Sequence, residues 1–190
     1  MQTTLLPKTE LKFVKRWTHG GVSLKKRRKI KRPLIPNTLT HLVLKSRKAH
    51  KELSFYKHKK LVHSLITLKS RQFFIEVIDY VNMGNHLHLK VKFKDPERFK
   101  KFLKSITSLI ARKITRARRG HRFGKFWDGL AYTRVLLSKF EELGLKGYFE
   151  GNHRERELGY QERVFYLTRF NQYLYRLKQV RAGPKITITN

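Results

Sequence analysis

Cysteine is absent from this sequence of 190 residues, which excludes disulfide bonds and zinc sites with cysteine ligands. Any bound metal ion must therefore use histidine and oxygen ligands. The absence also fits a reducing compartment, so we expect a cytoplasmic protein. No run of 18 or more apolar residues occurs, and we expect no segment that spans a bilayer. The N-terminus lacks the apolar core of a signal peptide.

Acidic residues are also scarce. The chain has 13 Asp and Glu against 45 Lys and Arg, and its net charge is +32. Self-repulsion of this size is tolerated when the partner is a polyanion. Nucleic acid is the first candidate, because neutralising each phosphate releases counterions; an anionic membrane surface is the alternative. A hydrophobic content of 39% predicts a folded domain with a core.

Residues 1–37 are expected to form a basic N-terminal arm. Within it, residues 25–32 carry seven positive charges in eight positions, among them Lys25, Arg27 and Arg28. Blocks of like charge are typical of segments that are disordered when free and contact nucleic acid. A solvated tail without a partner is the alternative interpretation.

Residues 86–93 alternate strictly between apolar and polar side chains, as in a strand with one buried face. The apolar set is Leu87, Leu89, Val91 and Phe93. The polar set is His86, His88, Lys90 and Lys92, which we expect on a solvated face. Two imidazoles two residues apart can bind one metal ion, and the lysines would attract an anion. A metal ion and a polyanion together indicate phosphodiester chemistry. Two histidines two residues apart also occur by chance on half-exposed strands.

The remaining pattern predicts an α+β protein. Strands are expected at 38–45 and 73–81, and a Gly–Asn turn at 82–85 returns the chain to the histidine strand. Helices are expected at 57–70, at 95–118 and from Ser138 toward Asn152, and a bent strand at 123–135. Two βαβ-like halves then form a ferredoxin-like antiparallel sheet with helices packed on one face. Residues 154–190 form a basic, tyrosine-rich extension.

Three stretches, in this order, resemble the single-tyrosine HUH transposases, specifically the REP-associated tyrosine transposases and related insertion-sequence transposases. Residues 81–90 resemble the family's histidine–hydrophobe–histidine strand. The segment 124–129, Gly-Lys-Phe-Trp-Asp-Gly, resembles its Gly-x-x-Trp-x-Gly element. Residues 148–152 resemble its Tyr-x-x-x-Asn helix. The resemblance covers about residues 38–153, which would form the catalytic domain with an HUH endonuclease-type fold.

The resemblance implies a mechanism and a set of site residues. Tyr148 would be the nucleophile, and His86, His88 and Asn152 would bind Mg²⁺ or Mn²⁺, with zinc still open. Tyr148 and Asn152 would share one face of a helix, being four residues apart. The tyrosine would cleave single-stranded DNA through a 5′-phosphotyrosine intermediate and rejoin it, as in DNA transposition. Single-stranded or hairpin DNA would be the partner, and family members are often homodimers.

Basic residues from several segments are predicted to contact the DNA: Lys25, Arg27, Arg28, Lys90, Lys92, Arg112, Arg116, Arg118 and Arg119. Two other functions stay open, a non-catalytic or domesticated nucleic-acid-binding protein with the same fold and an RNA- or ribosome-associated basic protein. Tyr132, Tyr160 and Tyr166 are rival nucleophiles.

The sequence departs from the family pattern at several positions. Gly84 and His153 stand where the family usually has proline. Glycine at 144, 147 and 151 predicts a weak or interrupted tyrosine helix, since each helical glycine costs about 0.5–1 kcal/mol relative to alanine. Such a helix would belong either to an enzyme whose tyrosine helix moves or to a decaying copy.

Overall fold

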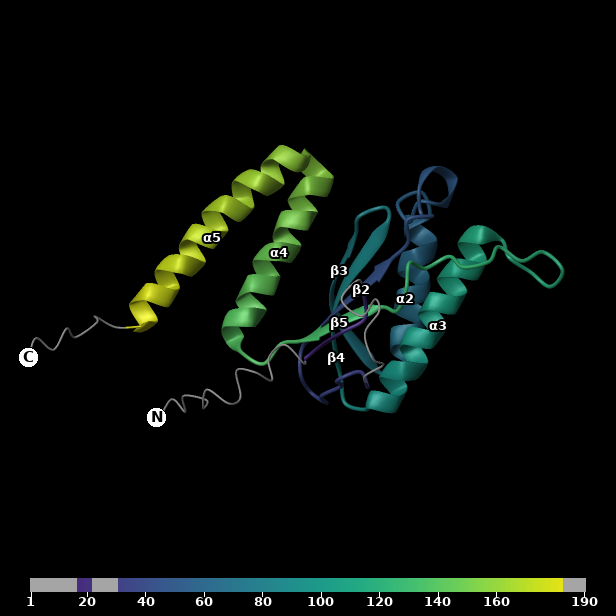
Figure 1. Ribbon diagram of the computed structural model, residues 1–190, viewed down its shortest axis with the longest axis horizontal. Helices are drawn as coiled ribbons and strands as arrows, with labels where there is room; N and C mark the ends of the chain where they lie inside the picture. The colour runs from purple at the N-terminus through teal and green to yellow at the C-terminus, as the bar shows by residue number, and fades with distance from the viewer. Residues whose placement is uncertain (1–16, 22–30, 183–190) are drawn as a thin grey trace, which may run out of the picture. The chain divides into compact units, whose positions relative to one another are not determined.

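The computed structural model describes residues 17–21 and 31–182, and the chain divides into two compact units at Lys139/Phe140. The described part of the first unit holds five strands in the order β1-β5-β2-β4-β3, each antiparallel to its neighbours. The strands are β1 Thr18–His19, β2 Thr40–Lys45, β3 Ile75–Asn82, β4 His86–Phe93 and β5 Tyr132–Val135. The helices are η2 Lys51–Leu53, α2 Lys59–Phe73 and α3 Pro96–Thr115. Figure 1 shows α2 and α3 side by side on one face of the sheet.

This arrangement confirms the predicted α+β fold. Strands β5, β2, β4 and β3 with α2 and α3 have the ferredoxin-like order, and β1 adds a short edge strand next to β5. That strand lies inside the region predicted as the basic arm. Lys25, Arg27 and Arg28 fall outside the described residues.

The alternation of β4 was predicted correctly for the core face. Its apolar side chains are buried together with those of β2 and α3: Leu42, Leu44, Leu87, Leu89, Val91, Phe93, Phe99, Phe102, Ile106 and Ile110. The residues of α3 in this set recur at helical spacing, so one stripe faces the sheet. Burial of this apolar stripe holds α3 against the sheet.

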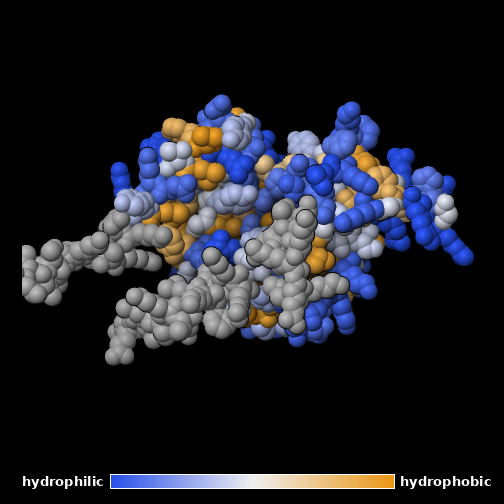
Figure 2. Space-filling model, in the orientation of Figure 1, coloured by the Kyte–Doolittle hydropathy of each residue, from blue (hydrophilic) through white to orange (hydrophobic). Residues whose placement is uncertain are grey.

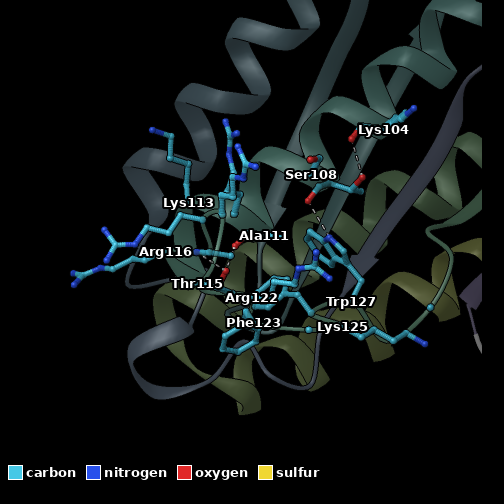
Figure 3. A pocket seen from close by; sticks show the side chains of 18 of the residues that line it. Lys104, Ser108, Ala111, Lys113, Thr115, Arg116, Arg122, Phe123, Lys125 and Trp127 are labelled. Atoms are coloured by element: carbon cyan, nitrogen blue, oxygen red, sulfur yellow. Dashed lines mark hydrogen bonds between the residues drawn. The ribbon is translucent and has the colours of Figure 1, made fainter.

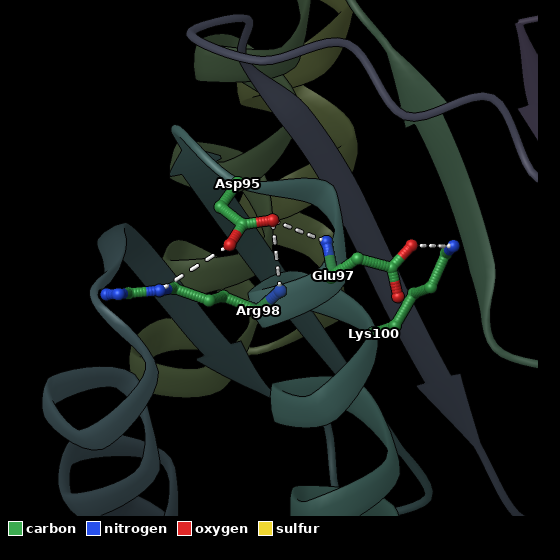
Figure 4. Close-up of polar contacts among 4 residues, drawn as sticks. All are labelled: Asp95, Glu97, Arg98 and Lys100. Atoms are coloured by element: carbon green, nitrogen blue, oxygen red, sulfur yellow. Dashed lines mark hydrogen bonds and ion pairs between the residues drawn. The ribbon is translucent and has the colours of Figure 1, made fainter.

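The start of α3 is capped by the Asp95 side chain (Figure 4). The Asp95 carboxylate accepts hydrogen bonds from the backbone N–H groups of Glu97 at 2.7 Å and Arg98 at 3.4 Å, and Pro96 is the first helical residue. Ion pairs of Asp95 with Arg98 and of Glu97 with Lys100 surround it. Such caps contribute about 1 kcal/mol.

The predicted bent strand over 123–135 is wrong in its first two thirds. Only Tyr132–Val135 is a strand, and residues 122–131 form a loop. Phe126 and Trp127 lie in the core from this loop, where the Trp127 ring stacks on Phe55 at 5.5 Å and Trp127 Nε1 donates to the Thr107 carbonyl at 3.0 Å. Phe126 and Trp127 therefore anchor a loop and not a strand.

The second unit contains α4 Lys139–Leu158 and α5 Tyr160–Ala182. The prediction of an interrupted tyrosine helix is wrong, because α4 is a single helix of 20 residues. Gly147 and Gly151 face α5, and a Cβ on either would meet Phe170 or Leu167 at 2.0 and 2.9 Å. The glycines thus permit a close approach of two helices. The boundary predicted at residue 153 falls within α4.

Hydrophilic residues cover much of the face seen in Figure 2, as the excess of basic side chains requires. In the part of the chain that the structure describes, no helix is both long and apolar enough to cross a membrane.

Candidate metal and nucleic-acid sites

His86 and His88 lie on β4, between β2 and β3, and point away from the helical layer. Their ring centroids are 4.7 Å apart at an interplanar angle of 83°. The two imidazoles therefore come together as predicted. The predicted solvated face is wrong for His88, which is only 4% exposed. It sits on a central strand in register with Val43 and Val81, so neighbouring side chains flank it on both sides.

The Nδ1 atom of His86 contacts Asn85. The Asn85 side-chain oxygen lies 2.6 Å from it, and because an amide oxygen only accepts, Nδ1 is the nitrogen that carries the hydrogen. The other ring nitrogen of a neutral His86, Nε2, then holds the lone pair that a metal ion requires.

The Nδ1 atom of His88 contacts a second histidine, His41 of β2. His41 Nε2 lies 3.0 Å from it, and the two rings stack with centroids 5.3 Å apart. Burial, with a smaller contribution from the charge of Arg134, lowers the pKa of His41 to about 4. His41 is therefore neutral near pH 7. No sequence signal indicated this contact, which joins residues 47 positions apart.

The two lysines of β4 are less available than predicted. Lys90 Nζ lies 3.9 Å from the Asp79 carboxylate, and its side chain is 12% exposed. Lys92 is half-buried and in register with Glu76 on β3. Acidic neighbours thus offset part of the positive charge on this face.

Asn152, the predicted third ligand, is 1% exposed on α4. Neither side-chain amide atom has a hydrogen-bond partner within the described part of the chain. Leaving a buried polar group unsatisfied costs about 1–3 kcal/mol, so an amide of this kind calls for a partner such as water, an ion or a ligand. Among the described residues, no group of three or more His, Asp and Glu side chains is arranged to hold a metal ion. His86 and His88 can offer two nitrogen donors to a metal ion, and Mn²⁺ accepts imidazole more readily than Mg²⁺ does.

Tyr148 and Asn152 lie four residues apart on α4, as predicted. The Tyr148 ring is half-buried, and the guanidinium of Arg163 on α5 lies 5.6 Å from its centroid. Arg163 also pairs with Glu155 at 2.6 Å. A guanidinium beside the ring is a group that can attract a phosphate toward the tyrosine.

Two of the rival tyrosines are held in their neutral form. Tyr166 Oη donates a hydrogen bond to Glu150, and partial burial with this bond raises the pKa of Tyr166 to about 12. Burial also raises the pKa of Tyr132, whose ring packs edge-on to His41 at 6.2 Å. Tyr160 is exposed at the start of α5.

A basic cavity of about 1400 Å³ lies between the second half of α3 and the loop that follows it. It brings together four residues predicted to bind DNA, Arg112, Arg116, Arg118 and Arg119. Arg122 and Lys125 also line it and were not predicted, although the run of charges from 116 to 125 was a signal. Figure 3 shows the basic side chains around Phe123 and Trp127. This cavity belongs to the helical layer, whereas the histidines lie on the other face of the sheet.

Comparisons with known proteins support the fold. No family model matches the chain, and no curated protein matches its sequence. A solved structure of a REP-associated tyrosine transposase bound to a REP hairpin matches with a TM-score of 0.51 and 11% identity, over 70% of this chain and 75% of that one. A structure described as "putative transposase from Deinococcus radiodurans R1" matches with a TM-score of 0.43 and 17% identity, over 66% and 98%. The predicted resemblance to tyrosine transposases is confirmed at the level of the fold.

Proposed function

We propose that this protein is a transposase-like enzyme that binds single-stranded, hairpin-bearing DNA and cleaves and rejoins it through Tyr148. The observation that carries the proposal is the pair of adjacent imidazoles, His86 and His88, at the centre of a transposase-type sheet. A second observation supports it: the buried side-chain amide of Asn152, on α4, has no hydrogen-bond partner among the described residues. A basic protein that only packs RNA would need neither feature.

Three side chains would hold the metal ion: His86, His88 and Asn152. A divalent cation there supplies polarisation of the phosphate and stabilises negative charge that develops on its oxygens. The histidines offer neutral nitrogen donors, and Asn152 offers an oxygen without adding charge. Such a site leaves coordination positions for phosphate and water.

Tyr148 would perform the covalent step. Its Oη attacks a phosphorus of the DNA strand and loses its proton, while the bond from phosphorus to the 3′ oxygen breaks and that oxygen takes up a proton. The products are a 5′-phosphotyrosine and a free 3′-OH. Attack by a 3′-OH on the phosphotyrosine reverses the step and rejoins a strand. The energy of the phosphodiester is kept in the intermediate, so no external energy source is required.

The basic cavity would bind the DNA backbone. Arginine guanidinium groups make paired hydrogen bonds to phosphate, and those of Arg112, Arg116, Arg118 and Arg119 line one cavity. Exposed Phe123 offers a ring on which a base of a single strand can stack. Lys25, Arg27 and Arg28 would add charge to this interaction from the N-terminal arm.

A covalent-adduct assay tests the proposal. The protein is incubated with labelled hairpin-bearing single-stranded DNA and Mn²⁺, and adducts are separated under denaturing conditions. We expect an adduct that is lost in Tyr148→Phe and in His86→Ala. Tyr160→Phe is the matched control, because Tyr160 is an exposed tyrosine of the same unit, and it should retain the adduct. DNA binding without an adduct would support a non-catalytic nucleic-acid-binding protein. A preference for structured RNA would support an RNA- or ribosome-associated basic protein.

A further inference from the structure

We propose that His41 is a positioning residue for His88, which it holds as the tautomer with the hydrogen on Nδ1 and the lone pair on Nε2. The inference rests on the proposed function, in which His88 is a metal ligand. His41, on β2, lies outside the three stretches that resemble the family. It contacts the proposed ligand His88 and not the metal ion.

The geometry of the contact is that of a hydrogen bond between two rings. His41 Nε2 and His88 Nδ1 are 3.0 Å apart, and the rings are nearly parallel, at 21°. The strands bring them together, because β2 and β4 are antiparallel neighbours in which Val43 is in register with His88 and His41 with Lys90. His41 is thus the diagonal neighbour of His88 on one face of the sheet, a position within reach of long side chains.

A hydrogen bond between two neutral imidazoles needs one proton. If His41 donates it, the proton of His88 must be on Nε2, and that nitrogen cannot bind a metal ion. If His88 donates from Nδ1, its Nε2 holds the lone pair. Only the second arrangement makes His88 a ligand, and in it His41 is the acceptor.

The same logic applies to the other predicted ligand. His86 Nδ1 donates to the Asn85 side-chain oxygen at 2.6 Å, so both ligand rings have a partner at Nδ1. Histidines that bind metals usually donate their second N–H in this way, and loss of the acceptor typically costs 10–100-fold in metal affinity. Both rings of the His41–His88 pair are buried, with 8% and 4% of their surface exposed, so water is a poor substitute for the acceptor.

The test uses the full chain and reads the His88 tautomer directly. In metal-free wild-type protein, long-range ¹H–¹⁵N spectra of the imidazoles should show His88 protonated at Nδ1 and not at Nε2. In His41→Leu, which removes the acceptor, the Nε2-protonated form should appear. Mn²⁺ affinity, measured by calorimetry, should fall about 10–100-fold. His41→Gln offers an amide oxygen near the same position and should recover most of the affinity.

His121→Leu is the matched control, because His121 is exposed in the loop after α3, and it should change neither the tautomer nor the affinity. A His88 tautomer that is the same in wild type and His41→Leu would overturn the inference, as would a wild-type His88 protonated at Nε2. The second result needs no variant, so it decides the matter even if His41→Leu does not fold. The adduct assay decides the proposed function separately, since the tautomer is read without metal or DNA.

Discussion

A Cβ atom added to Gly147 of α4 would lie 2.0 Å from Cε1 of Phe170 on α5, so these helices meet where a side chain is missing. The absence of a side chain at Gly147 therefore allows α4, the helix that carries Tyr148, to pack closely on α5. Phe170 also stacks on Tyr166 at 5.8 Å, which extends the contact along α5.

Gly147→Ala should destabilise the protein even though alanine is the better helix former. Overpacking typically costs about 1–3 kcal/mol, against a gain of about 0.5–1 kcal/mol from helix propensity. Urea unfolding followed by circular dichroism measures the difference. Gly144→Ala is the control, because a Cβ at Gly144 meets no described atom within 4 Å, and it should be neutral or stabilising. Equal effects of the two variants would contradict the contact.

Gly84→Pro, which restores the residue usual in the resembled family, should destabilise the turn before β4. Gly84 has a φ of +85°, whereas proline requires about −65°. Proline would also remove the Gly84 N–H that donates to the Asn82 side chain at 2.9 Å. We expect a loss of about 2–3 kcal/mol in the free energy of unfolding. Thermal unfolding followed by circular dichroism measures this loss. Gly129→Ala, at a glycine without positive φ, should be nearly neutral in the same measurement.

Tyr166 should ionise about two pH units above an ordinary tyrosine. Its pKa is raised from 10.0 to about 12, so the folded state keeps the proton longer than the unfolded state. The linked stabilisation is therefore complete below about pH 10 and is lost as the pH rises toward 12. Ultraviolet absorbance of tyrosinate, compared between wild type and Tyr166→Phe, should differ by a step near pH 12. Tyr160→Phe should retain that step, and a difference centred near pH 10 would refute the assignment.

Substituting the cavity arginines should weaken DNA binding in a salt-dependent manner. For Arg118→Ala with Arg119→Ala, the slope of log K against log salt should fall by about 0.7 for each phosphate that the variant no longer neutralises. Fluorescence anisotropy with labelled single-stranded DNA provides the measurement. Arg71→Ala removes an exposed arginine of α2 that does not line the cavity, and it should change the slope less. An equal change of the slope per arginine removed would show that only the total charge of the protein matters for DNA binding.

His88→Ala should abolish adduct formation and leave much of the DNA binding intact. The reason is that the basic cavity and arm would supply the affinity for DNA, whereas His88 would supply only a metal ligand. Adduct yield and anisotropy are measured on the same preparation, with His63→Ala on α2 as the control that keeps both. A parallel loss of cleavage and binding would contradict this separation of roles.

Much of the fold could be predicted from local rules. The bounds of β4 follow from its strict alternation, and the start of α3 follows from Asp95 and Pro96. The loop at 122–131 could not be predicted, because its aromatic residues are buried by contacts with Phe55 and α3 that are distant in sequence. The role of the α4 glycines could not be predicted for the same reason, because it depends on their contact with side chains of α5.

The sequence by itself determined which side chains share a face of β4, because a strand alternates regardless of its neighbours. It therefore placed His86 and His88 together. Only the tertiary structure decided that His88 is buried and that its Nδ1 meets His41, since burial and hydrogen bonding depend on which strand lies alongside and in what register.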